Sequence, residues 1–172
     1  MSAIETERLT LRPWTEDDVA SFHAIWGDAE VIWWGASKDE AASAEMLRVV
    51  LARTTGMAPV FGWRAVIERT TGRVAGSVAL QPARWAPEEV EVGWHLARAA
   101  WGKGFATEAA GALVERAFAD LRVPRVVAPI HVDNVRSRRV AARLGFARVG
   151  SMTHGGLPHD LYARARPPAV VP

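Results

Sequence analysis

The stretch AAWGKGFATEAAG, from Ala99 to Gly111, places two glycines one residue apart directly before an alanine-rich segment. Alanine favours helix, whereas glycine inside a helix or strand costs about 0.5–1 kcal/mol relative to alanine. Gly102 and Gly104 therefore mark a turn at the entrance of a helix. The run VEVGWHLA (Val90–Ala97) before them is typical of a strand, so the predicted order is strand, glycine turn, helix.

The glycine turn is a candidate anion site, because backbone N–H groups and the positive end of the helix dipole meet there. Gly104 permits a positive φ, and the small Ala106 lets a ligand approach the backbone closely. A Walker A loop requires Ser or Thr after its lysine, but Lys103 is followed by glycine. A dinucleotide fingerprint requires a third glycine where Thr107 stands, and the acid of the next strand, Asp133, comes too late. A third interpretation is the pyrophosphate loop of a CoA-binding acyltransferase.

Composition indicates one ordinary globular domain. The chain has 172 residues, of which 49% are hydrophobic and 23% charged, and a formal net charge of +2. Such a small charge does not favour a nucleic-acid partner. Cysteine is absent, which excludes disulfides and thiolate chemistry. No apolar run approaches the roughly 18 residues of a membrane span, so we expect a soluble, cytoplasmic protein without a membrane partner.

Periodicity and turn signals predict a mixed α/β sheet with helices on both faces. We expect a single domain over residues 1–166 and a disordered Pro-rich tail at 167–172. The predicted segments, in chain order, are a strand at 8–14, a helix from Thr15 to about Trp26, a helix at 41–53 opened by a Ser37–Glu40 capping box and ended by Gly56, a hairpin at 62–82, a strand at 90–97, a helix at 107–120, a strand at 124–132, a helix at 134–145 and closing strands at 146–152 and 159–165.

Two blocks of the sequence, EVGWHL…AAWGKGFATEAAGAL and PIHVDNVRSRRVAARLGFARVG, resemble the GNAT N-acetyltransferase superfamily. Within it, the chain is most similar to the ribosomal-protein N-terminal acetyltransferase-like (RimJ/RimL-type) branch, over about residues 5–165. The superfamily pattern Gln/Arg-x-x-Gly-x-Gly/Ala falls on residues 101–106. The second block of the branch, Asn-x-x-Ser followed by Gly-Phe, falls on Asn134, Ser137, Gly145 and Phe146.

The resemblance implies the GNAT acyl-CoA N-acyltransferase fold, with a mixed, mostly antiparallel twisted sheet and the order β-α-α-β-β-β-α-β-α-β-β. It implies acetyl-CoA as co-substrate and no metal. Trp101 replaces the Gln/Arg of the pattern, but main-chain amides hold a pyrophosphate without that side chain, so we expect binding to persist. The residues expected to bind the cofactor are Trp101, Gly102, Lys103, Gly104, Phe105, Ala106, Thr107, Asn134 and Ser137. Arg136, Arg138, Arg139 and Arg143 are further candidates to meet the phosphates of CoA.

Acyl transfer to an amine needs a base, and two candidates lie on the strand before the glycine turn. Glu91 and His95 are four residues apart and so share one face of that strand. The superfamily often uses a carboxylate on this strand, which Glu91 matches; the pKa of a histidine also suits the role. A tyrosine often donates the proton to the thiolate, but the only tyrosine here, Tyr162, is on a closing strand. Branch members use a serine instead, which corresponds to Ser137.

The acceptor pocket is expected between the two N-terminal helices and the late strands. Adjacent Trp33 and Trp34 cannot both face the core of an extended segment, so at least one lines the acceptor pocket or a homodimer contact. Trp85, in a predicted loop, is a third candidate. The overall interpretation is an N-acetyltransferase that moves the acetyl group directly to a primary amine of a protein N-terminus, an amino acid or a small molecule. The alternatives are a non-catalytic CoA-binding or regulatory module of the same fold, or transfer of another acyl group such as succinyl.

Overall fold

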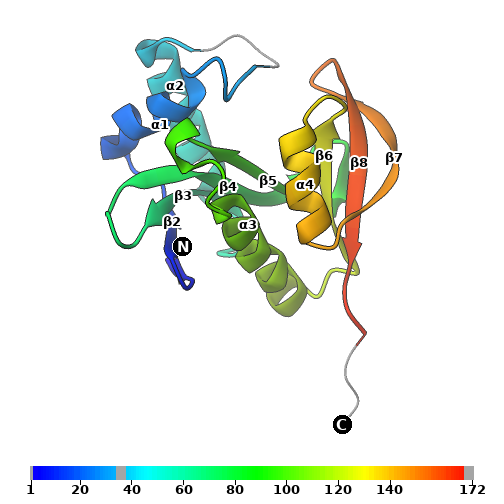
Figure 1. The fold of residues 1–172 in the computed structure, drawn as a ribbon. Coiled ribbons are helices and arrows are strands. Elements are labelled where there is room, and N and C mark those ends of the chain that lie inside the picture. Colours follow the sequence, from blue (N-terminus) through cyan, green and yellow to red (C-terminus); the bar gives the residue numbers. More distant parts are fainter. Residues whose placement is uncertain (1, 34–37, 169–172) are drawn as a thin grey trace.

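Eight strands form one mixed sheet with the order β1-β2-β3-β4-β5-β6-β8-β7 (Figure 1). The computed structural model describes residues 2–33 and 38–168. The strands are β1 (Ile4–Glu5), β2 (Leu9–Pro13), β3 (Gly62–Glu68), β4 (Val74–Ala83), β5 (Ala86–Leu96), β6 (Arg125–His131), β7 (Ala147–His154) and β8 (Leu157–Ala165). The helical segments are η1 (Glu16–Asp18), α1 (Val19–Trp26), α2 (Glu40–Thr54), η2 (Arg98–Ala100), α3 (Phe105–Arg116), η3 (Ala117–Leu121) and α4 (Val135–Arg143). The predicted α/β order is confirmed, with β1 as an addition.

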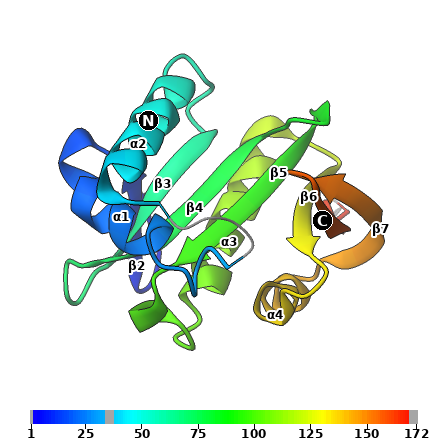
Figure 2. The same cartoon turned by 90° about the horizontal axis from the view of Figure 1, so that it is seen from above.

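The sheet opens between its two central strands. β5 and β6 are parallel and pair only at Val90–Val126 and Glu91–Val127, whereas the other neighbouring strands are antiparallel. Beyond Glu91 the two strands diverge, as Figure 2 shows. β5 continues to Leu96 with β4 as its partner, so its other edge is exposed to the space between the two halves of the sheet.

The alternation of side chains on β5 assigns its residues to two different layers. Val90 and Val92 are buried in the larger core, which α3 and α4 cover. Glu91 and His95 point to the opposite face, where α1 and α2 enclose a second core, and the ring of His95 lies 4.5 Å from that of Trp26. The predicted common face of Glu91 and His95 is therefore confirmed.

Two helix starts differ from the sequence prediction. The N-cap of α2 is Asp39, whose Oδ1 accepts a hydrogen bond from the N–H of Ala42 at 2.7 Å. Ser37, the predicted start of the capping box, lies outside the described residues. Helix α3 begins at Phe105, earlier than the predicted Thr107, because Gly104 itself serves as its N-cap. At its far end the α-helix stops at Arg116 and continues as the π-helical turn η3.

Strand β5 is longer than predicted. It begins at Ala86, because its antiparallel pairing with β4 extends to Ala83–Ala86, and Trp85 lies in the short turn between them. At the other end of the chain, β8 stops at Ala165, and residues 169–172 of the predicted tail lie outside the described part. Within that part, no helix has the length and apolar character to cross a membrane.

Candidate active site

The glycine turn has the geometry of an anion-binding loop. Gly102 and Gly104 have φ angles of +78° and +81°, in the left-handed region that glycine tolerates best. A side chain at Gly102 would meet nothing within 4 Å, so the loop faces open space. The first N–H of α3 that donates within the helix is that of Glu108, to the carbonyl of Gly104. The preceding amides of the first turn are free to bind a ligand.

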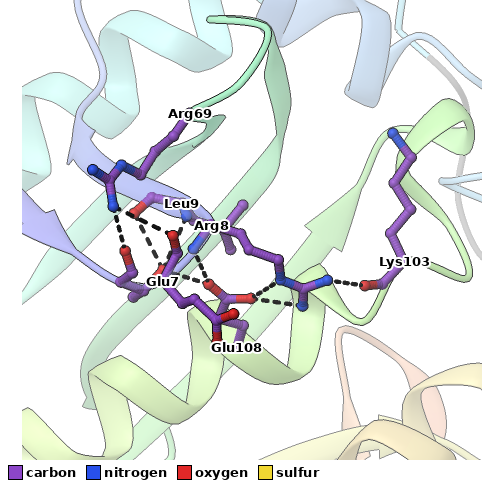
Figure 3. Close-up of polar contacts among 7 residues, drawn as sticks. Glu7, Arg8, Leu9, Arg69, Lys103 and Glu108 are labelled. Atoms are coloured by element: carbon purple, nitrogen blue, oxygen red, sulfur yellow. Dashed lines mark hydrogen bonds and ion pairs between the residues drawn. The ribbon is translucent and has the colours of Figure 1, made fainter.

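Arg8, which directly precedes β2, holds this loop in place (Figure 3). Its Nε donates to Oε2 of Glu108 at 2.7 Å, and its Nη1 donates to the carbonyl of Lys103 at 2.9 Å. The hydroxyl of Thr6 donates to Oε1 of Glu108 at 2.6 Å. Arg69 in turn donates to the carbonyls of Thr6 and Glu7. Burial acts to raise the pKa of Glu108, but these hydrogen bonds outweigh it and lower that pKa.

The side chains of the loop have separate roles. Trp101 donates from Nε1 to the carbonyl of Leu96 at 2.8 Å and packs against both cores. Lys103 reaches Glu68 at 3.3 Å, and Phe105 is buried in the larger core. These contacts fix the three side chains and so hold the main chain of the loop in place.

Thr107 has an unusual hydroxyl on the first turn of α3. Its Oγ1 is buried, and no described residue is its hydrogen-bond partner. A buried hydroxyl without a partner costs free energy, and this one lies next to the open amides of the glycine turn. This hydroxyl is therefore a candidate contact for an anion bound at those amides.

Helix α4 provides the facing wall. Asn134 caps it, accepting at Oδ1 from the N–H of Ser137 at 2.9 Å, as the sequence predicts. The guanidinium of Arg136 lies 4.2 Å from the ring centre of Trp101, which connects the two walls. Arg139 and Arg143 lie on the same wall, whereas Arg138 does not line the cleft.

Glu91 lies where β5 and β6 separate. It is only 9% exposed, and Gln81 on β4 is its side-chain hydrogen-bond partner. No described residue is a partner for its Oε2. Burial raises its pKa to about 7, against the opposing effects of Gln81 and Arg84. A carboxyl with this pKa can exchange a proton near neutral pH.

His95 has a different environment on the same face. Its ring contacts that of Trp26, at 4.5 Å, and stacks on that of Trp63, at 6.1 Å with an 8° angle between the planes. Burial lowers its pKa to about 4. The imidazole is therefore neutral at pH 7 and a weaker base than Glu91.

A row of aromatic rings borders the other end of the cleft. Trp33 is 42% exposed and packs edge-on against His131, at 4.9 Å between ring centres. His131 contacts His159 at 5.3 Å, and His159 contacts His154 at the same distance. Trp85, 37% exposed, closes the row at 5.4 Å from His154. The third predicted acceptor residue, Trp34, lies outside the described residues.

The glycine turn, the cleft side of α4, Glu91, His95 and four of the five rings of this row border one cleft of about 910 Å³. It brings together the predicted residues Glu91, His95, Trp33, Asn134, Ser137 and the loop from Trp101 to Thr107. Tyr162 is not among its lining residues and packs against the larger core. Sequence reasoning missed Arg8 and the three histidines of β6, β7 and β8. These residues are far apart in the sequence, so no local motif marks them as parts of one site. The only signal in the sequence is that arginine and histidine are residue types common in functional sites.

The family model "Acetyltransferase (GNAT) domain" matches residues 8–147. The chain belongs to the GNAT acetyltransferase family. It is similar to the uncharacterized N-acetyltransferase p20 of Bacillus licheniformis, with 29% identity over 154 residues, which cover 87% of this chain and 85% of that protein. GNAT membership confirms the predicted family, its fold and its enzyme class.

Two solved GNAT structures resemble it closely in fold. One is the aminoglycoside acetyltransferase AAC(6')-Ib in complex with coenzyme A, with a TM-score of 0.75 and 26% identity, covering 92% of this chain and 95% of that one. The other is RimL, a ribosomal-protein alpha-N-acetyltransferase, also in complex with coenzyme A. It has a TM-score of 0.75 and 20% identity, and the match covers 95% and 98% of the two chains. Relatives with this fold thus bind coenzyme A and acetylate chemically different acceptors.

Proposed function

We propose that this protein transfers the acetyl group of acetyl-CoA directly to a primary amine, with Glu91 as the general base. The observation that carries the proposal is one cleft that holds both an open amide loop and a buried carboxyl without a partner for one oxygen. The loop suits a pyrophosphate, and the carboxyl suits proton removal from an amine.

The cofactor is proposed to lie between α3 and α4. Its pyrophosphate would accept hydrogen bonds from the first-turn amides after Gly104, and the hydroxyl of Thr107 would gain a partner there. Arg136, Arg139 and Arg143 line the same cleft and would face the remaining phosphate charge. Acetyl-CoA acts here as a substrate that carries the acetyl group.

The reaction is proposed to proceed in one transfer. The amine nitrogen attacks the thioester carbonyl carbon, the C–N bond forms, and the C–S bond breaks. Glu91 takes the proton that the ammonium must lose, directly or through water, because its raised pKa of about 7 matches the working pH. The free edge of β5 beyond Glu91 offers backbone N–H groups to the carbonyl oxygen.

The leaving thiolate is proposed to be stabilised by Ser137. This residue lies in the first turn of α4 and lines the cleft, and its N–H already donates to Oδ1 of Asn134. Its hydroxyl is the group that remains for the sulfur. We assign Glu91 rather than His95 as the base, since the low pKa of the enclosed imidazole makes it the weaker proton acceptor.

The first experiment is a thermal-shift titration with acetyl-CoA, CoA and NAD in parallel. A ligand at 100 times its Kd stabilises a fold by about 2.7 kcal/mol, so we expect both CoA species to raise Tm and NAD to leave it unchanged. CoA release is then measured with protein N-terminal peptides, amino acids and small amines, using acetyl-CoA and succinyl-CoA as donors. Binding of CoA without turnover on any amine would favour a CoA-binding module instead.

A further inference from the structure

Two polar side chains on neighbouring strands lie in line with Glu91. Strands β3, β4 and β5 are side by side in the sheet (Figure 2). Gln81 on β4 stands directly opposite Glu91 in the register of β4 and β5. Trp63 on β3 pairs with Ala79, which is two residues from Gln81 on the same strand. Residues two apart on a strand point to the same face, so Trp63, Gln81 and Glu91 share the face of the second core.

The hydrogen bond from Trp63 fixes which end of the Gln81 amide is directed to Glu91. The Nε1–H of Trp63 donates to Oε1 of Gln81 at 3.2 Å. An indole nitrogen can only donate, so the amide oxygen must point to Trp63. The NH2 group of Gln81 is then the end that remains for Glu91, with which Gln81 forms a side-chain hydrogen bond. An NH2 group is a donor, so this bond stabilises the carboxylate more than the protonated carboxyl.

Ring packing holds Trp63 in place for this contact. Its indole stacks on the ring of His95 at 6.1 Å and lies 5.5 Å from the ring of Trp26. Neither Trp63 nor Gln81 is among the described residues that line the cleft, whereas Glu91 is. The two residues can therefore influence the reacting groups only through Glu91, which makes them positioning residues rather than catalytic ones.

Other charged and titratable groups surround Glu91 and must stay constant in any test. On the neighbouring strands and loops these are Glu30, Arg84, Glu89, His95, His131, His154 and His159. Glu89 is paired with Arg125, and burial keeps the pKa of His95 at about 4, so that its imidazole is neutral at pH 7. The charge of Arg84 lowers the pKa of Glu91, in the same direction as the bond from Gln81.

We propose that Gln81 is a positioning residue for Glu91, that it keeps an N–H donor on the Glu91 carboxyl, and that Trp63 fixes the direction of that donor. This inference rests on the proposed function and adds two residues to the support of its base. The Trp63–Gln81–Glu91 relay favours the ionised carboxylate, which is the form that accepts a proton from the amine. It opposes burial, which by itself favours the protonated form.

The first test measures the pKa of Glu91 by ¹³C NMR of its carboxyl carbon, whose signal is assigned by its loss in Glu91→Gln. Gln81→Met nearly keeps the length of the side chain and removes the donor, so the pKa should rise from about 7 to about 8. Trp63→Phe keeps a ring beside His95 and removes the N–H, so the pKa should rise by a smaller amount. An unchanged or lowered pKa in Gln81→Met would overturn the proposal.

Trp14→Phe is the matched control for the loss of an indole N–H. Trp14 belongs to the same core and donates from Nε1 to Oγ of Ser77 on β4, also at 3.2 Å. Its replacement should leave the pKa of Glu91 unchanged. The double variant Gln81→Met/Trp63→Phe should have the same pKa as Gln81→Met alone, because Trp63 acts through Gln81. A further rise in the double variant, or an equal rise in Trp14→Phe, would contradict the relay.

The pH dependence of turnover provides a second readout. With pKa values of about 7 and about 8 for the base, Gln81→Met should reduce kcat/KM for the amine about fivefold at pH 7 and less than about twofold at pH 9. Ionisation of the amine affects both proteins equally and cancels in this ratio. The KM for acetyl-CoA should be unchanged. A loss of the same size at every pH would mean that Gln81 only supports the fold, and would overturn the proposal.

The NMR measurement separates this inference from the proposed function, because it needs neither an acceptor nor turnover. If the pKa moves as expected while Glu91→Gln retains full turnover, the relay to Glu91 is supported and its role as the base is refuted. If Glu91→Gln loses turnover while Gln81→Met leaves the pKa unchanged, the base is supported and the relay is refuted.

Discussion

The guanidinium of Arg8 contacts the carboxylate of Glu108 at 2.6 Å across 100 residues of chain and also donates to the carbonyl of Lys103. One side chain directly before β2 thus anchors both the glycine turn and the first turn of α3 (Figure 3). Through these contacts the pair positions the amides that are proposed to bind the pyrophosphate.

Replacement of Arg8 by methionine should loosen the glycine turn. The Arg8 side chain is 46% exposed, so its ion pair adds at most about 1 kcal/mol to stability. We expect a several-fold higher KM for acetyl-CoA with a small change in Tm. Arg48→Met removes a comparable exposed ion pair with Glu45 on α2 and should change neither quantity. Equal KM values for the two variants would mean that the anchor is dispensable.

Gly104 and Gly72 provide a matched test of the loop. Their φ angles are +81° and +69°, so alanine at either position carries a similar backbone penalty of about 1–2 kcal/mol. Gly72 lies in the turn between β3 and β4, away from the cleft. Thermal melts should show similar destabilisation for both variants, while CoA titration should show weakened binding only for Gly104→Ala. Normal CoA binding by a folded Gly104→Ala protein would refute the loop assignment.

Thr107→Val should separate stability from binding. Valine has nearly the same shape and removes a buried hydroxyl that has no described partner, so the apo protein should gain up to about 1–3 kcal/mol. If the hydroxyl meets the pyrophosphate, the same change raises the Kd of CoA. Calorimetry of apo and CoA-bound protein measures both effects. A variant that gains stability without losing CoA affinity would assign Thr107 no role in binding.

Glu91→Gln should remove the base and retain the cofactor site. We expect kcat/KM for the amine to fall by about 10²–10⁴, with an unchanged Kd for CoA. In the wild type, kcat/KM should fall with pH below about 7, where the carboxyl becomes protonated. The glutamine variant should lack this step and show only the titration of the amine. A pH profile shared by both proteins would exclude Glu91 as the base.

The same substitution should stabilise the fold in a pH-dependent way. Burial raises the pKa of Glu91 to about 7 from its ordinary value of 4.5. Below pH 4.5 the carboxyl is protonated in both the folded and the unfolded chain and is not penalised. Above pH 4.5 the unfolded chain ionises more readily than the folded protein, so the free energy of unfolding falls as pH rises through 7, where the folded protein must hold a buried carboxylate. Glu91→Gln should therefore raise the free energy of unfolding by about 1–3 kcal/mol at pH 8, with a higher Tm. At pH 4 it should change neither quantity.

The control for this measurement is Glu88→Gln, the same substitution at an exposed position of β5. Its Tm difference from the wild type should be small and the same at both pH values. If Glu91→Gln behaves like the control, ionisation of the Glu91 carboxyl costs the folded protein no stability.

Local chemistry determined much of this protein. The positive φ of Gly104, the cap made by Asn134 and the face shared by Glu91 and His95 depend on residues within one turn or one strand, so the sequence predicts them correctly. The same local reasoning predicted a capping box that begins at Ser37, whereas the N-cap of α2 is Asp39. Both residue types suit an N-cap position, and they stand only two residues apart. The blocks around Gly104 and Asn134 were also sufficient for the family.

The tertiary structure decided the chemistry within the cleft. The pKa of Glu91 depends on burial at the point where β5 and β6 part, the anchoring of Glu108 depends on Arg8, 100 residues away in the chain, and the row of aromatic rings joins four separate segments. Desolvation, hydrogen bonding and ring packing act over a few ångströms in space, between groups that strand register brings together. A single sequence specifies those groups but does not show which of them become neighbours.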